Sequence, residues 1–336
     1  MSTPDMLVRL LVRSRGVRMV ATSADVARLA GVSRATVSQV LNGHAHRFAT
    51  ETAQKVLHAA QELDYEPSIA GRTLRRGSSD FVVALIPHTT FGSNLQDLFE
   101  RMTLTLADHG YTLVLRMAGV SPRSLDRLVV GMSPAAVFSL APLSDEDREV
   151  LNKRGVLAID PPSVTEVDHN RAIGQLQART LIDAGHRHIA YAHLRDERQD
   201  TYGLAREEGV RDVARVYGLE PIGVAHVALD LKEAVARLDE LGPLPLAIAC
   251  YNDDVAMTFL SVARDQGLEV PGDLAVIGMD HTNVSRISVP RLTTIEYDLA
   301  SAAEGGTASL LRALGAGTTR PEAAPAALEL IPGETV

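Results

Sequence analysis

The segment GVSRATVSQVLNG, residues 31–43, determines which fold the N-terminal part of this 336-residue chain is expected to adopt. Val37, Val40 and Leu41 recur at the spacing of one helical face, so we expect that face to pack against a core. Ser33 can cap the helix at its start. The opposite face then presents small and polar side chains, namely Arg34, Ala35, Ser38 and Gln39.

A shorter helix is predicted directly before this segment, in TSADVARLA, residues 22–30. Thr22 and Asp25 can cap its first turn reciprocally. Gly31 follows at once and tolerates the left-handed backbone conformation that ends a helix. Two helices joined by so few residues are typical of a helix-turn-helix. The apolar face of the first helix is expected to consist of Val26, Ala27, Leu29 and Ala30.

A third helix is expected to close a three-helix core. Thr50 is predicted as its N-cap, and Glu51 is favourable at the positive end of the helix dipole. Together the three helices are predicted to form a domain over residues 22–66. The apolar stripe of the third helix is expected to consist of Val56, Leu57, Ala60 and Leu63.

The exposed face of the second helix carries groups that can read DNA bases. Arginine pairs with guanine O6 and N7, glutamine pairs with adenine N6 and N7, and an alanine methyl group can contact the methyl group of thymine. Hydroxyl groups and the N-terminus of the helix can hold phosphates. A solvated polar face is the alternative, but the preceding helix and turn favour DNA. The predicted DNA contacts in this module are Ser33, Arg34, Ala35, Thr36, Ser38, Gln39 and Asn42.

A basic segment, YEPSIAGRTLRRGSS at residues 65–79, follows the predicted domain. Pro67 disfavours helix just before itself and Gly77 ends the segment, which leaves about two helical turns. A helix of this length is marginal alone, so we expect it to order only against a partner. Leu74 lies among basic residues and is predicted to insert between base steps from the minor groove. Residues 67–79 are therefore predicted as a hinge, and an ordinary polar linker is the alternative.

Charge is distributed unevenly along the chain, whose net charge is -9. Residues 1–79 contain 11 Lys and Arg against 6 Asp and Glu, while the remaining residues contain 22 against 36. A basic end joined to an acidic body predicts an anion-binding module on a domain with another task, and a basic tail without a partner is the alternative. Residues 1–21 are expected to be a disordered or untranslated extension, with a start at Met19. A basic arm along DNA or a short amphipathic helix is the alternative there.

The composition excludes several classes of protein. With 46% hydrophobic and 22% charged residues, the chain is expected to be soluble and globular. No apolar stretch has the length of a membrane span, and residues 1–20 lack the pattern of a signal peptide. We therefore expect a cytoplasmic, nucleoid-associated protein without a membrane partner. Cys250 is the single cysteine and is expected to be a core residue.

From residue 80 onward, short apolar runs alternate with longer amphipathic stretches. This alternation predicts an α/β fold of parallel, doubly wound sheets with helices on both faces. Eight strands are many for one sheet, and PPS at residues 161–163 interrupts the series, so we expect two lobes with a cleft between them. The predicted strands are residues 81–87, 111–117, 135–140, 156–160, 188–194, 223–228, 245–251 and 274–280, with a further strand at 327–331.

The same part of the chain contains no signature of catalysis or of a cofactor. A GxGxxG motif, a phosphate-binding loop, a GxSxG nucleophile elbow, an HExxH motif and a cysteine pair are absent from the sequence. His186 and His188 have no further ligands beside them and are expected on the surface. We therefore predict a protein that is not an enzyme, with no catalytic residue, no metal and no cofactor.

Polar side chains follow the ends of two predicted strands, at residues 251–253 and 280–282. Ligands of doubly wound folds bind at the carboxyl ends of strands. Arg206 opens a helix after another strand, and a guanidinium combined with amide and carboxylate groups can make bidentate hydrogen bonds to a polyol. Acidic residues at strand ends are also common helix caps, so Asp253 is expected either as a cap or as a ligand contact.

Two long stretches resemble the lactose-repressor (LacI/GalR) family of bacterial transcription regulators. TSADVARLAGVSRATVSQVLNG and ATETAQKVLHAAQELDYEPSIAGRTLRRGSS are similar to its DNA-binding headpiece and hinge. LIDAGHRHIAYAH and the segment from LAIACYNDDVAM to RLTTIEYD are similar to its C-terminal lobe. The resemblance implies that Arg34, Ala35 and Gln39 read bases and that Leu74 enters the minor groove. Gln39 stands where most members have Arg, which predicts an altered operator preference.

The resemblance also implies a two-lobed effector domain related to periplasmic sugar-binding proteins, over residues 80–336. One lobe is expected at about 80–162 plus 293–321, and the other at about 163–292 plus 322–336. Arg206, Asn252 and Asp280 would hold the hydroxyl groups of a sugar. The further candidates for the effector site are Phe91, Asp160 and Tyr251.

The expected function is that of a sequence-specific DNA-binding transcription regulator, a repressor that binds a palindromic double-stranded operator. A small-molecule effector, a sugar or a sugar derivative, would control it allosterically. The tail at residues 315–336 lacks leucine heptads, so a homodimer is predicted rather than a coiled-coil tetramer. The alternative is a sugar-binding or other solute-binding protein without a DNA function.

Overall fold

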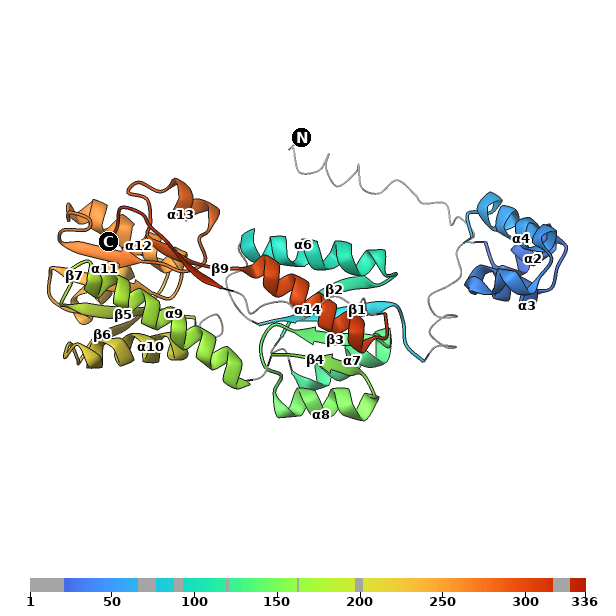
Figure 1. The fold of residues 1–336 in the computed structure, drawn as a ribbon, viewed down its shortest axis with the longest axis horizontal. Helices are drawn as coiled ribbons and strands as arrows, with labels where there is room; N and C mark the ends of the chain where they lie inside the picture. Colours follow the sequence, from blue (N-terminus) through green and yellow to red (C-terminus); the bar gives the residue numbers. More distant parts are fainter. Residues whose placement is uncertain are drawn as a thin grey trace, which may run out of the picture. The chain divides into compact units, whose positions relative to one another are not determined.

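The computed structural model describes residues 21–65, 77–87, 93–118, 121–161, 163–196, 202–316 and 327–336. The chain divides into two compact units, residues 1–78 and 79–336, which Figure 1 draws. Leu74, Phe91, most of the predicted hinge and nearly all of the N-terminal extension lie outside the described residues. Within the described ranges, no helix is both long and apolar enough to cross a membrane.

The first unit contains the predicted helix-turn-helix. Its helices are α2 (Ser23–Ala30), α3 (Arg34–Gln39) and α4 (Thr50–Glu62), and a π-helical turn and a 3-10 turn follow α3 at Val40–His44 and Ala45–Arg47. They enclose one small core, which confirms the expected three-helix arrangement. The fully buried members of this core are Val26, Ala27, Val37, Val40, Ala53, Val56, Ala59 and Ala60.

Local hydrogen bonds explain where the first two helices begin and end. The carboxylate of Asp25 accepts hydrogen bonds from the backbone N–H of Thr22 at 3.0 Å and from its hydroxyl at 2.6 Å. Gly31 ends α2 in the left-handed conformation with a φ of 67°, which glycine adopts without steric cost. Ser33 then caps α3, because its hydroxyl accepts a hydrogen bond from the N–H of Thr36 at 3.1 Å.

Three predictions about the helical core are wrong. Thr50 is the first residue of α4 and Ala49 is its cap, a shift of one position. Leu29 and Leu57 are not core residues, since 48% and 50% of their surfaces are exposed. The buried side of α4 consists of Ala53, Val56, Ala59 and Ala60, and Leu57 lies outside it.

The second unit contains two parallel four-stranded sheets, which confirms the predicted α/β fold. Their strand orders are β2-β1-β3-β4 and β6-β5-β7-β8, so the two lobes repeat one topology. All eight expected strands are present. They are β1 (Phe81–Ile86), β2 (Thr112–Met117), β3 (Ala136–Ser139), β4 (Leu157–Ile159), β5 (Ile189–Leu194), β6 (Gly223–Val227), β7 (Leu246–Cys250) and β8 (Leu274–Ile277).

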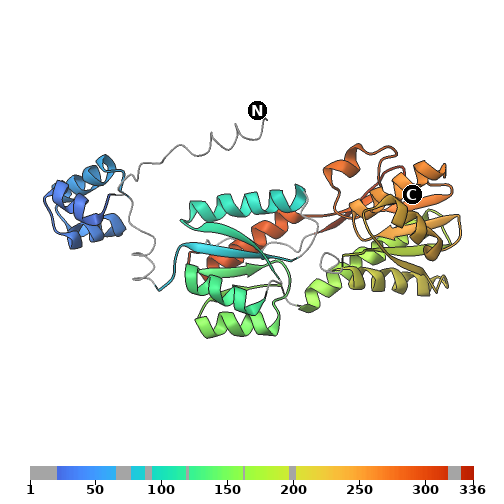
Figure 2. The same ribbon diagram turned by 180° about the vertical axis from the view of Figure 1, so that it is seen from behind.

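Helices lie on both sides of each sheet, as Figures 1 and 2 show. In the second lobe, Ala190 and Ala192 of β5 pack towards α11 and α12, whereas Ile189 and Tyr191 pack towards α9 and α10. Burial on both faces explains why these strands read as continuous apolar runs. The helices are α6 (Ser93–Asp108), α7 (Pro122–Met132), α8 (Asp145–Arg154), α9 (Ser163–Asp183), α10 (Gly203–Val216), α11 (Leu231–Leu241), α12 (Asp253–Gln266), α13 (Asn283–Ile287) and α14 (Leu299–Ala313).

A two-stranded antiparallel sheet pairs β9 (Thr294–Tyr297) with β10 (Leu328–Ile331). The strand at β10 was expected and the one at β9 was not, because its residues TIEY alternate too briefly to stand out. After β9 the chain returns to the first lobe, where α14 lies beside α6 in both views (Figures 1 and 2). The C-terminal residues lie on the second lobe, where the hydroxyl of Thr335 donates to the carbonyl of Val276 at 2.7 Å.

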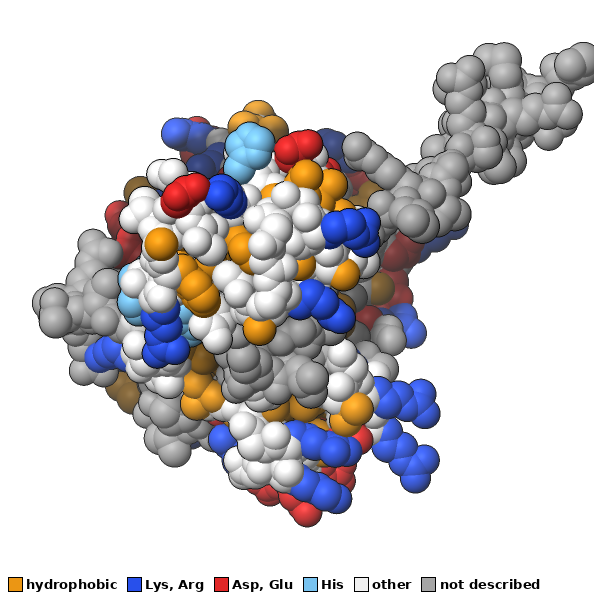
Figure 3. Space-filling view, turned by 90° about the vertical axis from the view of Figure 1, so that its right-hand side faces the viewer, with side chains coloured by type: hydrophobic (Ala, Val, Ile, Leu, Met, Phe, Trp, Pro, Cys, Tyr) orange, Lys and Arg blue, Asp and Glu red, His pale blue; other side chains and the backbone are white. Residues whose placement is uncertain are grey.

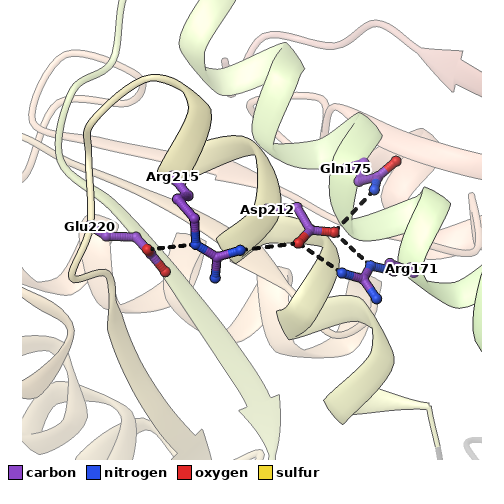
Figure 4. Close-up of polar contacts among 5 residues, drawn as sticks. All are labelled: Arg171, Gln175, Asp212, Arg215 and Glu220. Carbon is purple, nitrogen blue, oxygen red and sulfur yellow. Dashed lines mark hydrogen bonds and ion pairs between the residues drawn. The ribbon is translucent and has the colours of Figure 1, made fainter.

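Helices α9 and α10 touch backbone to backbone. A Cβ atom added at Gly174 would lie 1.9 Å from the carbonyl oxygen of Arg206, and one added at Gly209 would lie 2.0 Å from that of Arg171. Beside this contact, Arg171 donates two hydrogen bonds to Asp212, at 2.6 and 2.8 Å (Figure 4). The backbone contact and the hydrogen bonds therefore hold α9 and α10 firmly together.

Replacement of Gly209 by alanine should force the helices apart. We expect Gly209→Ala to lower the free energy of unfolding of the second unit by about 1–3 kcal/mol, the usual range for overpacking. Gly131→Ala in α7 is the matched control, because nothing lies within 4 Å of its added Cβ. The control should be neutral or stabilising by up to about 1 kcal/mol. Urea denaturation of both variants checks this, and equal midpoints would contradict it.

Candidate functional site

The first candidate site is the outer face of α3. Val37 and Val40 are buried on its inner side, whereas Arg34, Ala35, Ser38 and Gln39 are exposed on the other. Ser33 and Thr36 lie at the start of the helix, with their hydroxyl oxygens 2.9 Å apart. Asn42 belongs to the following π-helical turn, and its side chain is outside the described part.

Two of the basic side chains in the first unit are already ion-paired. Arg28 forms an ion pair with Asp25 at 2.9 Å, and Lys55 forms one with Glu51 at 2.8 Å. Among the described residues, Arg34 has no such ion pair. Figure 3 shows basic, acidic and apolar side chains interspersed on the face that it draws. An exposed guanidinium beside small side chains suits close approach to the edge of a base pair.

The second candidate site is a cleft of about 720 Å³ within residues 79–336. It lies where strands of both sheets end, since Pro87 follows β1, Leu140 follows β3, Tyr251 follows β7 and Met279 follows β8. In each lobe the first strand pairs with the third, β1 with β3 and β5 with β7. The order of the strands reverses at this point, and doubly wound folds bind ligands there. The prediction of a cleft at the carboxyl ends of the strands is therefore confirmed.

Arg206 is the central polar residue of this cleft. It is buried in the first turns of α10, and its Nε donates to Oδ1 of Asn170 at 2.9 Å. One Nη donates to the carbonyl oxygen of Tyr251 at 2.5 Å. The guanidinium also lies 4.9 Å from the centre of the Tyr251 ring and 5.7 Å from that of Tyr202. These contacts hold one side chain between three elements, so its orientation is set before any ligand arrives.

Asp280, which lines the same cleft, has a strained backbone conformation. Its φ is 105° and that of His281 is 46°, a region that favours glycine. The hydrogen bond from the N–H of Asp280 to the carbonyl oxygen of Ile295, 2.9 Å long, holds this turn in place. Burial raises the pKa of Asp280 to about 7 against the opposing charge of Arg206. A carboxyl group with this pKa exchanges its proton near neutrality and can donate or accept a hydrogen bond.

Asn252 and Asp253 have structural tasks. Asn252 caps α12, because its Oδ1 accepts a hydrogen bond from the N–H of Val255 at 3.1 Å, and it is not one of the residues that line the cleft. Asp253 is fully buried and is not the cap of the helix. Its carboxylate instead accepts hydrogen bonds from the N–H of Thr282 at 2.7 Å and from the hydroxyl of Thr294 at 2.6 Å. It thereby anchors the turn that carries Asp280.

Asp160 lines the cleft, but both of its oxygens are engaged. Arg148 donates to them at 2.7 and 3.2 Å, and the N–H of Leu143 donates at 2.8 Å. This bidentate pair fastens the end of β4 to α8 within the first lobe. Tyr251 also lines the cleft, as expected, whereas the predicted residue Phe91 lies outside the described residues.

Several cleft residues were missed by the sequence analysis. Asn170 and His169 come from α9, which has no polar pattern that distinguishes them from other helical residues. Asp254 follows two other polar residues after β7, and its pKa is raised by burial and by the charge of Asp253. The remaining polar or aromatic residues found in the cleft without having been predicted there are Phe138, Ser139, Tyr202, Asn283, Tyr297 and Ser309.

The raised pKa of Asp280 predicts how the stability of the protein depends on pH. The native state keeps this proton up to about pH 7, while the unfolded chain releases it near pH 4, so the free energy of unfolding should fall as pH rises between those values. Relative to Asp280→Asn, the wild type should lose about 2–3 kcal/mol between pH 5 and pH 8. Urea denaturation of both proteins at the two pH values measures this difference. Parallel changes in both proteins would mean that Asp280 titrates normally.

Comparisons with known proteins match parts of both units of the chain. Residues 22–68 match the family model "Bacterial regulatory proteins, lacI family", and residues 178–336 match "Periplasmic binding protein-like domain". The transcriptional repressor PurR of Vibrio campbellii is 31% identical over 82% of this chain and 86% of its own length. The transcriptional regulator GalR of Escherichia coli is 30% identical over 84% of this chain and 86% of its own.

A solved structure has the same fold. The lac repressor dimer bound to operator and the anti-inducer ONPF superimposes with a TM-score of 0.74, at 20% identity, over 94% of this chain and 98% of that one. The two regulators match 82% and 84% of this chain at 31% and 30% identity. The chain therefore belongs to the lacI family of bacterial regulatory proteins.

Proposed function

We propose that the protein is a cytoplasmic transcription repressor that binds a palindromic operator as a homodimer, and that a small molecule in the cleft sets its affinity for DNA. One observation carries the proposal. A helix-turn-helix with an exposed recognition face and a two-lobed body with a preorganised polar cleft occur in one chain. A recognition face for DNA and a cleft for a small molecule in one chain support control of DNA binding by a ligand.

On DNA, Arg34, Ala35 and Gln39 read base edges in the major groove, while Ser33 and Thr36 contact phosphates. Two subunits place their copies of α3 in successive major grooves, so the operator has two half-sites about one helical turn apart. Ser38 and Asn42 extend the contact along the helix. Leu74 of the hinge enters the minor groove between the half-sites, which bends the duplex.

In the cleft, Arg206 and Asp280 hold the hydroxyl groups of a sugar or a sugar derivative. Tyr251 packs beside the ring of the ligand. Asp160 lines the cleft with its carboxylate held by Arg148, and Phe91 remains a predicted contact. Asn252 is left out of the proposed site, because it caps α12 and does not line the cleft. The ligand binds to one arrangement of the lobes better than to the other. Only such a difference in affinity can change the affinity for DNA, since equal binding to both states shifts nothing.

Selection of bound fragments from a random duplex library tests the whole proposal. The purified protein would be used alone and with a pool of monosaccharides and glycosides. Recovery of a palindrome whose enrichment changes with one ligand class is the expected result. Recovery of no preferred sequence under any condition would overturn it, and would favour the alternative of a solute-binding protein without a DNA function.

Arg34→Ala should weaken binding to the selected operator by about 1–3 kcal/mol and relax the preference at one base pair of each half-site. The expected loss is specific because a bidentate pair with guanine discriminates against other bases. Arg28→Ala is the matched control, because Arg28 lies on α2 and is already ion-paired with Asp25. Fluorescence anisotropy on operator and point-mutated duplexes measures both. Uniform weakening on every duplex would make Arg34 a phosphate contact.

A further inference from the structure

The amide side chain of Gln177 is fully buried between α9 and the second sheet. Asn170, Ile173 and Gln177 are spaced by three and four residues, so they project from one face of this helix. Asn170 and Ile173 line the cleft, whereas Gln177 is not one of the described residues that do so. The face of α9 therefore continues from the cleft to the ends of the strands beneath it.

One nitrogen atom of this side chain joins two neighbouring strands. Nε2 of Gln177 donates to the carbonyl oxygen of Cys250 at 2.9 Å and to that of Gly278 at 3.1 Å. The paired register of β7 and β8 ends one residue earlier on each strand, with Ala249 opposite Ile277. A side-chain amide has two hydrogens that can donate. The glutamine therefore links the two strands where their own pairing stops.

The two carbonyl groups lie directly before residues of the cleft. Tyr251 follows Cys250, and Asp280 comes two residues after Gly278. The N–H of Gly278 donates to the carbonyl oxygen of Thr293 at 2.9 Å, so both polar groups of Gly278 are held. A displacement of either strand end would therefore move a side chain that lines the cleft.

The same face of α9 also holds the arginine of the cleft. Asn170 accepts a hydrogen bond from Nε of Arg206 at 2.9 Å, and Arg206 donates to the carbonyl oxygen of Tyr251. Gln177 holds the carbonyl group one residue before Tyr251. One helix face thus sets the position of the guanidinium and the positions of the two strand ends that lie beside it.

A glutamine that only fills space in the core is the alternative. Ala178 and Leu181 of the same helix belong to an apolar core. In the part of the chain that the structure describes, Oε1 of Gln177 accepts no hydrogen bond, and a buried acceptor without a partner lowers stability. An apolar side chain of similar length would fill the space without this cost. The benefit of the amide is therefore confined to the two carbonyl groups that it holds.

We propose that Gln177 is a positioning residue of the cleft, whose amide fixes the spacing between the ends of β7 and β8 and thereby places Tyr251 and Asp280 relative to Arg206. The inference rests on the proposed function, because it concerns the same cleft. Gln177 acts through the backbone of the two strands and makes no contact with the ligand.

Gln177→Met tests this proposal on the full-length protein, because methionine has a similar length and no donor. Gln175→Met is the matched control, since Gln175 lies on the same helix but donates to Asp212 of α10, at 3.2 Å (Figure 4). The measured quantity is the fall in the free energy of unfolding between pH 5 and pH 8 that Asp280 causes. It is the difference between each protein and its Asp280→Asn derivative in urea denaturation.

This fall should shrink to about half or less in Gln177→Met and stay unchanged in Gln175→Met. When the strand ends separate, Asp280 becomes more hydrated and its raised pKa returns towards the ordinary value. A role in stability alone would lower the free energy of unfolding equally at both pH values. An unchanged fall in Gln177→Met would therefore overturn the proposal.

Isothermal titration with the pool of monosaccharides and glycosides gives a second readout. The pool member that changes operator enrichment should bind Gln177→Met about tenfold more weakly than the wild type, and Gln175→Met within about twofold, because misplaced groups lose their hydrogen bonds to the sugar. Circular dichroism shows whether each variant folds, and Gln177→Leu replaces Gln177→Met if that variant does not. Unchanged affinity, or failure of both variants to fold, would overturn the proposal.

The outcome for Gln177 is separable from that of the proposed function. The pH dependence of unfolding requires neither DNA nor a sugar, whereas the fragment selection uses the wild type alone. A ligand-sensitive palindrome together with an unchanged fall in Gln177→Met would reject the role of Gln177 and leave the proposed function standing. Absence of any palindrome together with a reduced fall would do the reverse.

Discussion

The polar end of the cleft depends on the backbone contact between α9 and α10. Side chains at Gly174 and Gly209 would collide with carbonyl oxygens of the opposite helix, so the close approach requires glycine at both positions. This approach brings Asn170 of one helix within hydrogen-bonding distance of Arg206 of the other. Arg206 in turn holds the carbonyl group that follows β7. Gly174 and Gly209 thus allow the packing that positions the guanidinium group of Arg206, which we propose as a ligand contact.

The turn that carries Asp280 has a cost in stability. Asp280 combines a left-handed backbone with a carboxyl group whose burial raises its pKa, and both features oppose folding. The buried carboxylate of Asp253 compensates in part, because it fixes the next turn through Thr282 and Thr294. Strain of this kind is typical of binding sites, where a bound ligand can supply the missing interactions.

The sequence predicted those features whose cause is local. Apolar runs and periodicity identified the eight strands of the two parallel sheets, and the turn at Gly31 identified the helix-turn-helix. Strand ends led to Arg206, Tyr251 and Asp280, which the structure brings into one cleft. Asn170 could not be found in this way, since it reaches the site only through the packing of α9 on α10.

Two side chains show the remaining limit of sequence patterns. Asn252 follows a strand and begins a helix, and a ligand contact and a helix cap have the same sequence signal at such a position. Leu57 has an apolar side chain at a suitable spacing, yet it is half exposed and the core of the first unit forms without it. Both outcomes depend on tertiary packing and on competing hydrogen bonds.

The central claim is that the cleft and the recognition helix are coupled. Thermodynamic linkage requires that the ligand changes DNA affinity by the same factor by which DNA changes ligand affinity. Titration of the most tightly bound glycoside into the protein, with and without a saturating concentration of the selected operator, measures this factor directly. The account predicts a change of at least about fivefold that equals the factor measured from the DNA side. Identical ligand affinities with and without operator would contradict it.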